Sequence, residues 1–379
     1  MKVYIDGLFY KGFGIGRYYE ALTKEFAKRG IKIFTCIPQD LKSEFEKDFS
    51  GYNNIQPLFV DYKKFSLSGF FKHTNILKNI QREVDLFFFP HINLPYSIPS
   101  TKNIIITVHD LIPLSNIYKK QILKRTIFYF LVKRAVKISH KIICVSNSVA
   151  DELLKIFPQI SHKIQVIYEF VDDKFVNQNF QIKKRIIDEP YLLFVGNRKK
   201  HKNLEILLRG FSKIKDKIPH YLVIAGGKNK EKDEIDILVE KLNLQQRVIQ
   251  YVRPSDEIIL NLYKFADLFI FPSLIEGFGL PPCEAVSMGC PVILSDIPVL
   301  KEIFGDSGFY FNPYDEKDLA DAILKVIFNS NLKNQILLNQ KKRIEVFSKE
   351  KIIEEYIKLF ESVINSKNES FTFRKTLST

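Results

Sequence analysis

Short apolar runs alternate with amphipathic segments along most of this chain of 379 residues. Each run carries few polar residues and leads through a turn into a segment with helical spacing. Strands of a parallel sheet have this continuous apolar character, because helices cover both of their faces. The predicted strands are 3–5, 31–36, 85–90, 103–108, 141–145 and 164–167, and then 191–195, 221–225, 248–252, 268–271, 292–294 and 308–311.

Apolar positions at helical spacing fill most of the intervals between these strands. Residues 37–82 are the exception: they are polar and irregular, and predict only a mobile helical segment. The regular alternation of strand and helix predicts an α/β architecture with parallel sheets. The predicted helices are 17–29, 117–138, 146–156, 204–214, 231–242, 255–265, 299–304, 315–329, 334–347 and 352–364.

The chain is too long for one ordinary hydrophobic core, so two domains are expected. The alternation is interrupted once, at residues 171–189, where periodicity is lost and the charge is mixed. We therefore predict a Rossmann-like domain at 1–170, a linker at 171–189 and a second Rossmann-like domain at 190–347. A last amphipathic helix at 348–365 and a polar, disordered tail at 366–379 follow.

Hydrophobic residues make up 46% of the chain and charged residues 26%, as in a globular protein. The apolar runs are far shorter than a membrane span, and Met1 leads directly into the first strand, which leaves no room for a signal peptide. Cys36, Cys144 and Cys290 lie in apolar surroundings and are expected to be buried free thiols. These features predict a cytoplasmic protein.

A net charge of +14 favours anionic partners: nucleotides, nucleic acid or the phosphate-rich face of a membrane. Much of this charge lies on the helix predicted at 117–138. One interpretation is a solvated helix packed on the sheet; the other is a basic amphipathic surface held against anionic lipid. Its basic residues are Lys119, Lys120, Lys124, Arg125, Lys133, Arg134 and Lys137, and its apolar ones are Ile122, Leu123, Ile127, Phe130 and Leu131.

The richest candidate site is the stretch EGFGLPPCEAVSMGCP at 276–291, which follows the strand 268–271. A strand, a glycine-containing turn and a helix start present backbone N–H groups to a phosphate. Two carboxylates accompany them: Glu276 before the glycines, and Glu284 in the predicted first turn of the helix. Acids beside an anion site would repel the anion, so they are expected to bind hydroxyls, as on the sugars that flank a diphosphate.

Three further segments are expected at the carboxyl ends of strands, where open parallel sheets bind ligands. The basic turn from Arg198 to Lys202 follows the strand 191–195, and Lys202 can pair with a diphosphate. His109 and Asp110 follow the strand 103–108, as either a site or a simple turn. Glycines 12, 14 and 16 precede the helix predicted at 17–29 without GxGxxG spacing, so they form either a flexible turn or a helix N-terminus facing a ligand.

These motifs resemble, in the expected order, those of the retaining GT-B glycosyltransferases of family 4. EGFGLPPCEA is similar to the E-x7-E signature, VGNRKKHKN to the G-x5-KN diphosphate segment and VHDLIPL to the HD loop. GIGRY at 14–18 resembles the N-terminal loop of the mannosyl- and rhamnosyltransferase-like members. The resemblance implies two Rossmann-like domains facing across a cleft that closes for the chemistry, with the last helix returning to the N-terminal domain.

The resemblance also implies roles within the second domain. Glu284 would bind the ribose hydroxyls of the nucleotide, and Glu276 the hydroxyls of the transferred sugar. Lys202, together with Arg198, would neutralise the diphosphate leaving group by electrostatic catalysis. The turn residues Gly277, Phe278 and Gly279 would offer backbone N–H groups to sugar or phosphate.

In the first domain, the carbonyl of His109 would face the oxocarbenium-like centre, and Gly14 and Gly16 would close over the phosphates or the acceptor. Two departures from the family pattern concern the diphosphate: Asn197 and His201 stand where arginines are common. The phosphate role of Arg198 is therefore less secure than that of Lys202. The family needs no metal, in line with the lack of a DxD motif here.

The sequence thus predicts retaining transfer of a hexose, with mannose a candidate, from a nucleotide-diphosphate sugar such as GDP-mannose. The acceptor would be a glycan or lipid-linked saccharide in lipopolysaccharide or polysaccharide synthesis, with no cofactor or metal. The protein would be cytoplasmic, with peripheral contact at the anionic inner face of the membrane.

Three other classes of protein share some of these features. A sugar-phosphate synthase or a hydrolysing epimerase would share the architecture. A basic nucleic-acid-binding protein would share the charge, but no nucleic-acid-binding motif is present, and specific nucleic-acid binding is not expected. A dinucleotide oxidoreductase is disfavoured by the missing GxGxxG.

Overall fold

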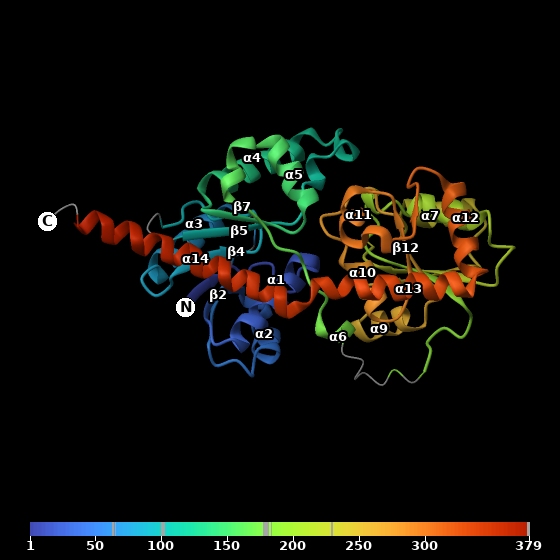
Figure 1. The fold of residues 1–379 in the computed structure, drawn as a ribbon, viewed down its shortest axis with the longest axis horizontal. Helices are drawn as coiled ribbons and strands as arrows, with labels where there is room; N and C mark the ends of the chain where they lie inside the picture. The colour runs from blue at the N-terminus through green and yellow to red at the C-terminus, as the bar shows by residue number, and fades with distance from the viewer. Residues whose placement is uncertain are drawn as a thin grey trace. The chain divides into compact units, whose positions relative to one another are not determined.

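The chain divides into two compact units, each with its own parallel sheet (Figure 1). Unit 1 comprises Met1–Glu169 and Lys349–Thr379, and unit 2 comprises Phe170–Ser348. The fold is that of a computed structural model, which describes residues 1–62, 64, 66–99, 103–176, 182, 184–228 and 230–376. The predicted α/β class with two parallel-sheet domains is confirmed.

Unit 1 is built on a seven-stranded sheet in the order β3-β2-β1-β4-β5-β6-β7, and every neighbouring pair is parallel. The residues of β4 and β5 are all buried, as expected for strands covered on both faces. The strands are β1 Lys2–Ile5, β2 Lys32–Pro38, β3 Ile55–Val60, β4 Leu86–Phe89, β5 Asn103–Val108, β6 Lys141–Cys144 and β7 Ile164–Val166.

The strand β3 was not predicted, and its position in the sheet explains why. It is an edge strand whose middle residues are only half-buried, and it contains Pro57. Proline is confined to edge strands because it has no N–H to donate to a neighbouring strand. Residues 37–82 also hold two helices, α2 Lys42–Asp48 and α3 Leu67–Ile80, where the sequence predicted a single helical segment.

The first helix, α1 Phe13–Lys28, begins before the predicted start at residue 17. Its N-cap is Gly12, so Gly14 and Gly16 lie within the helix and not in a loop before it. A Cβ at Gly16 would come within 2.5 Å of the Phe9 carbonyl oxygen, whereas one at Gly14 would meet nothing within 4 Å. Close backbone packing therefore requires the glycine at 16 but not the one at 14.

The remaining helices of unit 1 include one from the far end of the chain. They are α4 Ile122–Ile138, α5 Asn147–Ile156 and α14 Lys349–Thr376. Figure 1 shows α14, in red, running beside the strands of unit 1. Its Tyr356 and Phe360 rings contact Phe26 and Phe88, and the Asn103 side-chain amide donates to the Val363 carbonyl at 2.7 Å.

The predicted disordered tail from residue 366 needs correction, because the backbone of α14 stays helical to Thr376. No glycine or proline lies between Lys349 and Thr376 to end the helix. Residues 377–379 lie outside the described residues. The predicted linker at 171–189 holds one short helix, α6 Asp173–Val176, and its residues 177–181 and 183 lie outside the described residues.

Unit 2 is built on a six-stranded parallel sheet in the order β10-β9-β8-β11-β12-β13, and all six strands were predicted. They are β8 Tyr191–Val195, β9 Tyr221–Gly226, β10 Val248–Val252, β11 Leu268–Phe271, β12 Val292–Ser295 and β13 Tyr310–Phe311. The helices are α7 Leu204–Ser212, α8 Glu234–Lys241, α9 Asp256–Phe265, α10 Leu280–Ser287, α11 Pro298–Phe304, α12 Glu316–Ile327 and α13 Ser330–Ile344.

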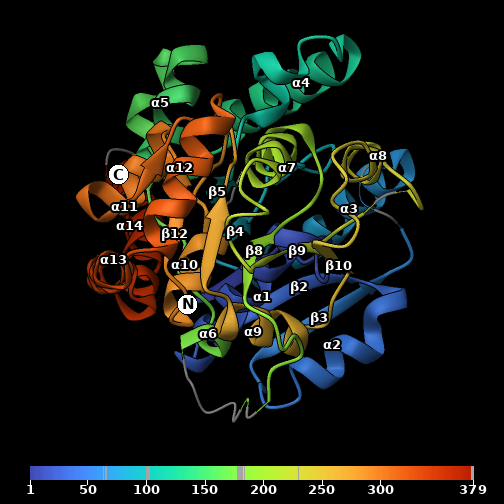
Figure 2. The ribbon, with the colours of Figure 1, turned by 90° about the vertical axis from the view of Figure 1, so that its right-hand side faces the viewer.

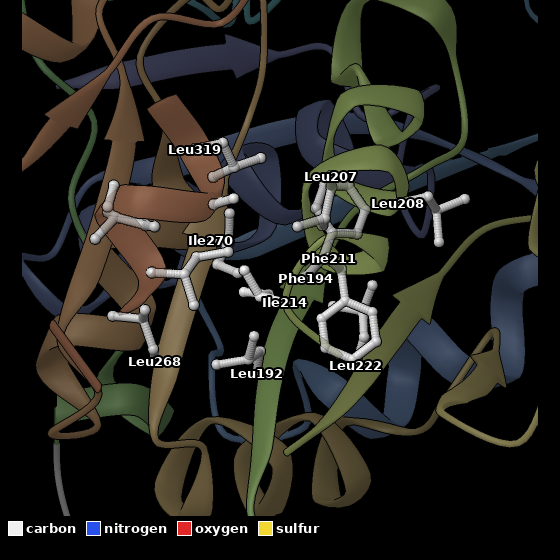
Figure 3. Close-up of a cluster of buried hydrophobic side chains, with 14 of the residues drawn as sticks. Leu192, Phe194, Leu207, Leu208, Phe211, Ile214, Leu222, Leu268, Ile270 and Leu319 are labelled. Carbon is white, nitrogen blue, oxygen red and sulfur yellow. The ribbon is translucent and has the colours of Figure 1, made fainter. Parts of the chain in front are cut away.

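The helices of unit 2 cover both faces of this sheet (Figure 2). On one face, α7 and α12 pack on alternate strand residues such as Phe194 and Ile270, with Phe211 and Leu319 from the helices (Figure 3). On the other face, Tyr263 of α9 packs against Phe269, with ring centroids 5.5 Å apart. All four cysteines of the chain are buried free thiols, which confirms that prediction for Cys36, Cys144 and Cys290.

One glycine holds the ends of β8 and β9 together. Gly226 has a φ of +142°, and a Cβ there would come within 1.9 Å of the Gly196 carbonyl oxygen. Only glycine allows the backbone after β9 to approach the turn after β8 so closely. The turn that leads to Arg198 and Lys202 is therefore positioned from its neighbouring strand.

We predict that Gly226→Ala destabilises unit 2 by about 3 kcal/mol or more, because both the clash and the positive φ oppose a side chain. Gly51→Ala is the control, since a Cβ at Gly51 meets nothing within 4 Å. Chemical denaturation followed by circular dichroism measures both. Equal stability of the two variants would contradict the close approach.

Candidate active site

The candidate site of unit 2 lies where two loops leave neighbouring strands. The strands β8 and β11 are neighbours in the middle of the sheet. The strands β9 and β10 extend the sheet on the side of β8, and β12 and β13 extend it on the side of β11. Ligands of open parallel sheets bind at the carboxyl ends of the strands at such a switch point. The Leu274 amide after β11 donates to the His201 carbonyl after β8 at 2.8 Å, so the two loops are directly joined.

The two loops bring Lys202 and Glu276 into an ion pair. The Lys202 Nζ atom lies 2.6 Å from the Glu276 Oε1 atom, and the two side chains are only 11% and 10% exposed. Lys202 Nζ also lies 5.2 Å from the centre of the Phe271 ring. The sequence assigned these two residues to different parts of one substrate, and the structure places them in contact.

The neighbouring His201 contributes no positive charge at neutral pH. Its side chain is buried, and burial lowers the pKa of His201 to about 4, against the attraction of Glu276. Beside it, Lys202 is the buried cation of the loop, whereas Lys199 and Lys200 are exposed.

The turn after Glu276 leads into α10 through a glycine with positive φ. Gly279, the N-cap, has φ 101° and ψ 54°, and a Cβ there would come within 3.0 Å of Leu300. Pro281 and Pro282 occupy the second and third helical positions and have no N–H. The amides of Gly279 and Leu280 are thus the donors that this helix start can offer to a ligand.

The other two residues of the turn can offer only backbone groups to a ligand. Phe278 is buried, and its ring packs edge-on against Phe347 with centroids 5.5 Å apart. Its side chain is therefore a packing element, and only its backbone can face a ligand. The predicted role of Gly277 is likewise one of backbone only.

Glu284 lies in the second turn of α10, not in the first as predicted, because the helix begins at Leu280. Glu284 is 3% exposed, and its Oε2 atom accepts a hydrogen bond from the buried Tyr263 hydroxyl at 3.1 Å. A buried carboxylate held by a tyrosine is fixed in direction. A hydroxyl donor such as a ribose would meet an oriented acceptor here.

The side-chain partners of Arg198 are residues other than Lys202 and Glu276. Its Nη1 atom lies 3.1 Å from Asp233 and 3.0 Å from Asp236, and Nη2 donates to the Gln250 side chain. Although burial opposes ionisation, Lys228 and Arg198 hold the pKa of Asp236 well below its usual range. A phosphate on Arg198 would have to displace these two carboxylates or share the guanidinium with them, and the diphosphate role of Arg198 stays a prediction.

In unit 1, His109 follows β5 and is held from both sides of its ring. Nδ1 lies 2.9 Å from Glu169 Oε1, Nε2 lies 3.0 Å from the Pro90 carbonyl oxygen, and Tyr18 packs edge-on at 4.6 Å. Burial disfavours the imidazolium, but the hydrogen bond and charge of Glu169 outweigh it and raise the pKa of His109. Two acceptors on one ring suit the doubly protonated form.

Unit 1 also contains a buried charged cluster that the sequence analysis did not identify. Asp6 is fully buried, with His73 and His91 Nε2 atoms each 3.5 Å from one of its carboxylate oxygens. Tyr4 shares a 2.7 Å hydrogen bond with His73. Asp6 directly follows β1, and His91 lies two residues after the neighbouring strand β4; these positions at strand ends were the available signal.

We predict that Glu169→Gln lowers the pKa of His109 by about one unit or more, because a carboxylate within hydrogen-bond distance stabilises the imidazolium. The folded pKa of His109 exceeds its unfolded value of about 6.5. The pair therefore stabilises the folded protein fully below that value and loses its effect as pH rises through the folded pKa. NMR titration of the imidazole measures the shift, and an unchanged pKa would refute the pairing.

Comparison with known families gives two adjoining matches. The model described as Glycosyltransferase Family 4 matches residues 14–175, and the model described as Glycosyl transferases group 1 matches residues 176–343. Lys202, Glu276 and Glu284 lie within the second match and His109 within the first.

Among curated proteins, the O-antigen chain mannosyltransferase RfbU of Salmonella typhimurium is 34% identical over 231 residues. The alignment covers 61% of this chain and 63% of that protein, so it spans about three fifths of the relative's length. The similarity is thus substantial but partial.

Solved structures show the same fold over almost the whole chain. Sucrose-phosphate synthase from Thermosynechococcus elongatus has a TM-score of 0.77 at 16% identity, covering 97% of this chain and all of that one. HepE of Anabaena, in complex with UDP and glucose, has a TM-score of 0.75 at 17% identity and covers 96% of this chain and all of that one. The two matches together extend over residues 14–343, so the chain carries a Glycosyltransferase Family 4 domain followed by a Glycosyl transferases group 1 domain, in a GT-B fold.

Proposed function

We propose that this protein transfers a hexose from a nucleotide-diphosphate sugar to a saccharide acceptor, with retention of configuration. Unit 2 binds the donor. Lys202 contacts the diphosphate, Glu276 the hydroxyls of the transferred sugar and Glu284 the ribose. The amides of Gly279 and Leu280 complete the anion site at the start of α10.

The observation that carries this proposal is the Lys202–Glu276 ion pair at the switch point. An ammonium ion has three donors, and only one is needed for Glu276. A diphosphate arriving beside Lys202 gains a nearly buried cation, while Glu276 is left to accept from sugar hydroxyls. The pair therefore keeps both charges compensated until the donor binds.

The charge on Lys202 then serves the chemical step. As the glycosidic bond breaks, negative charge grows on the diphosphate oxygen. A fixed cation therefore stabilises the transition state more than the ground state. Little solvent reaches the pair, which strengthens the interaction. His109, Gly14 and Gly16 in unit 1, and metal independence, remain predictions.

Mannose is the proposed hexose, because RfbU of Salmonella typhimurium is described as an O-antigen chain mannosyltransferase. GDP-mannose is therefore the first donor to test, and a lipid-linked saccharide in surface polysaccharide synthesis the proposed acceptor class. The enzyme would work at the inner face of the membrane, where such acceptors lie. None of the described helices is both long and apolar enough to span a bilayer.

We predict that Lys202→Met weakens binding of the nucleoside diphosphate about 10- to 100-fold, because a charge-assisted hydrogen bond is lost. Glu276→Gln should leave that affinity within about threefold but lower turnover at saturating donor about 100-fold, since its contact is to the sugar. Calorimetry with GDP, and product formation with GDP-mannose, measure the two effects.

The control is Lys200→Met, which removes an exposed lysine from the same loop. It should bind GDP like the unsubstituted protein. Glutamine is preferred to alanine at 276 because it keeps a hydrogen-bond acceptor for the nearly buried Lys202. If Lys202→Met and Lys200→Met bind equally well, Lys202 does not contact the diphosphate.

We predict separately that Glu284→Gln weakens nucleoside binding about tenfold or more, because the ribose hydroxyls lose a charged acceptor. Tyr263→Phe is the matched variant: it removes the 3.1 Å hydrogen bond to Glu284 but keeps the carboxylate. It should cost about 1 kcal/mol of stability with little change in affinity. If both variants lose only stability, Glu284 has a structural role alone.

A further inference from the structure

The helix α4 exposes four of the five apolar residues that the sequence analysis considered for packing on the sheet, all but the half-buried Leu131. Ile122 is 72% exposed, Leu123 74%, Ile127 53% and Phe130 59%. The residues that α4 buries are Val132, Ala135 and Val136, in its C-terminal half. The packed interpretation is therefore wrong for the first half of the helix.

The exposed apolar residues form one stripe. Leu123, Ile127 and Phe130 are spaced four and three residues apart, so they lie above one another on the same side of the helix. Single exposed apolar side chains are common on proteins, but a contiguous group on one helix marks an interaction site. We define the α4 surface as Ile122, Leu123, Ile127 and Phe130 with Lys120 and Lys124.

Lysines frame this stripe at both ends. Lys120 and Lys124 are exposed near its start, and Lys133 and Lys137 follow Phe130 by three and seven residues, on the same side. Among the described residues, none of these four lysines pairs with a carboxylate. The sequence explains this locally, because no aspartate or glutamate occurs between Asp110 and Asp151.

The arginines of α4 have a different role. Arg125 donates to the Ser115 carbonyl at 2.5 Å, and Arg134 donates to the Leu94 and Tyr96 carbonyls at 3.1 and 2.7 Å. They attach the helix to its own unit. The lysines are left as the exposed charges that a partner would meet.

We propose that the α4 surface docks on a leaflet of anionic phospholipid. Lysines attract phosphate head groups, and the isoleucine, leucine and phenylalanine side chains enter the boundary between head groups and acyl chains. Nucleic acid would use the charge but not the apolar stripe. The inference rests on the proposed lipid-linked acceptor for its purpose, since docking would hold the enzyme where that acceptor lies.

The test is flotation of the full chain with phosphatidylcholine vesicles, with and without phosphatidylglycerol. The protein should float only with the anionic vesicles, and less at high salt, because salt screens the lysines. Lys120→Gln with Lys124→Gln should weaken binding about 25-fold, at about fivefold for each lysine near an anionic surface. Ile127→Ser with Phe130→Ser should weaken it about tenfold or more.

Matched controls come from unit 2. Ile237→Ser with Phe328→Ser removes the same residue types at similar exposure, 55% and 69%. Lys241→Gln with Lys317→Gln removes two exposed lysines. Both pairs should float like the unsubstituted protein, and every variant should keep its unfolding temperature, because the substituted side chains are exposed.

Equal flotation of the α4 variants and the controls, or no preference for anionic vesicles, would overturn the proposal. So would a dimer that Ile127→Ser with Phe130→Ser converts to monomer, or binding of RNA in place of vesicles. Transfer from the nucleotide sugar to a soluble acceptor is measured in parallel. If the proposed function is wrong, no protein transfers the sugar, whatever the flotation result. If only the docking surface is wrong, transfer is seen while flotation does not depend on the α4 surface.

Discussion

The ion pair between Lys202 and Glu276 is the interaction on which the candidate site depends. Two opposite charges, almost removed from water, are stable only while each compensates the other or a ligand takes the partner's place. The surrounding structure holds the two side chains in place. The strands β8 and β11 are neighbours at the switch point of the sheet, and the Leu274–His201 hydrogen bond joins their loops. Gly226 allows the neighbouring turn to fit closely.

The sequence alone predicted much of this arrangement, for a physical reason. Strands buried on both faces have to be apolar throughout, so apolar runs such as Leu268–Phe271 can be recognised as strands in the sequence. Because the strands are parallel, the residues that follow them fall at one edge of the sheet. Lys202 and Glu276 were therefore expected together. That they bind each other was not predicted, because spacing along the chain gives a shared edge but no side-chain partner.

The features that the sequence did not predict also have a common cause. Each involves either a partner distant in sequence or a surface that has no partner within the fold. The carboxylate partners of Arg198, Asp233 and Asp236, come from the start of α8, and the sequence did not predict that pairing. The half-buried edge strand β3 has a weak apolar signal. In α4, the apolar pattern is the same whether it faces a core or a membrane, and only the fold shows that Ile122 and Leu123 are exposed.

The return of α14 to unit 1 has a consequence for synthesis. Unit 2 is continuous in sequence, whereas unit 1 is interrupted by it and is completed only by residues from Lys349 onward. Tyr18, Phe26 and Phe88 meet Tyr356 or Phe360 in the finished protein. On the ribosome, these aromatic residues emerge first and find their partners last, after the whole of unit 2 has been made. The nascent N-terminal unit thus carries an uncovered aromatic surface for most of translation, and a message truncated before residue 349 would leave it uncovered permanently.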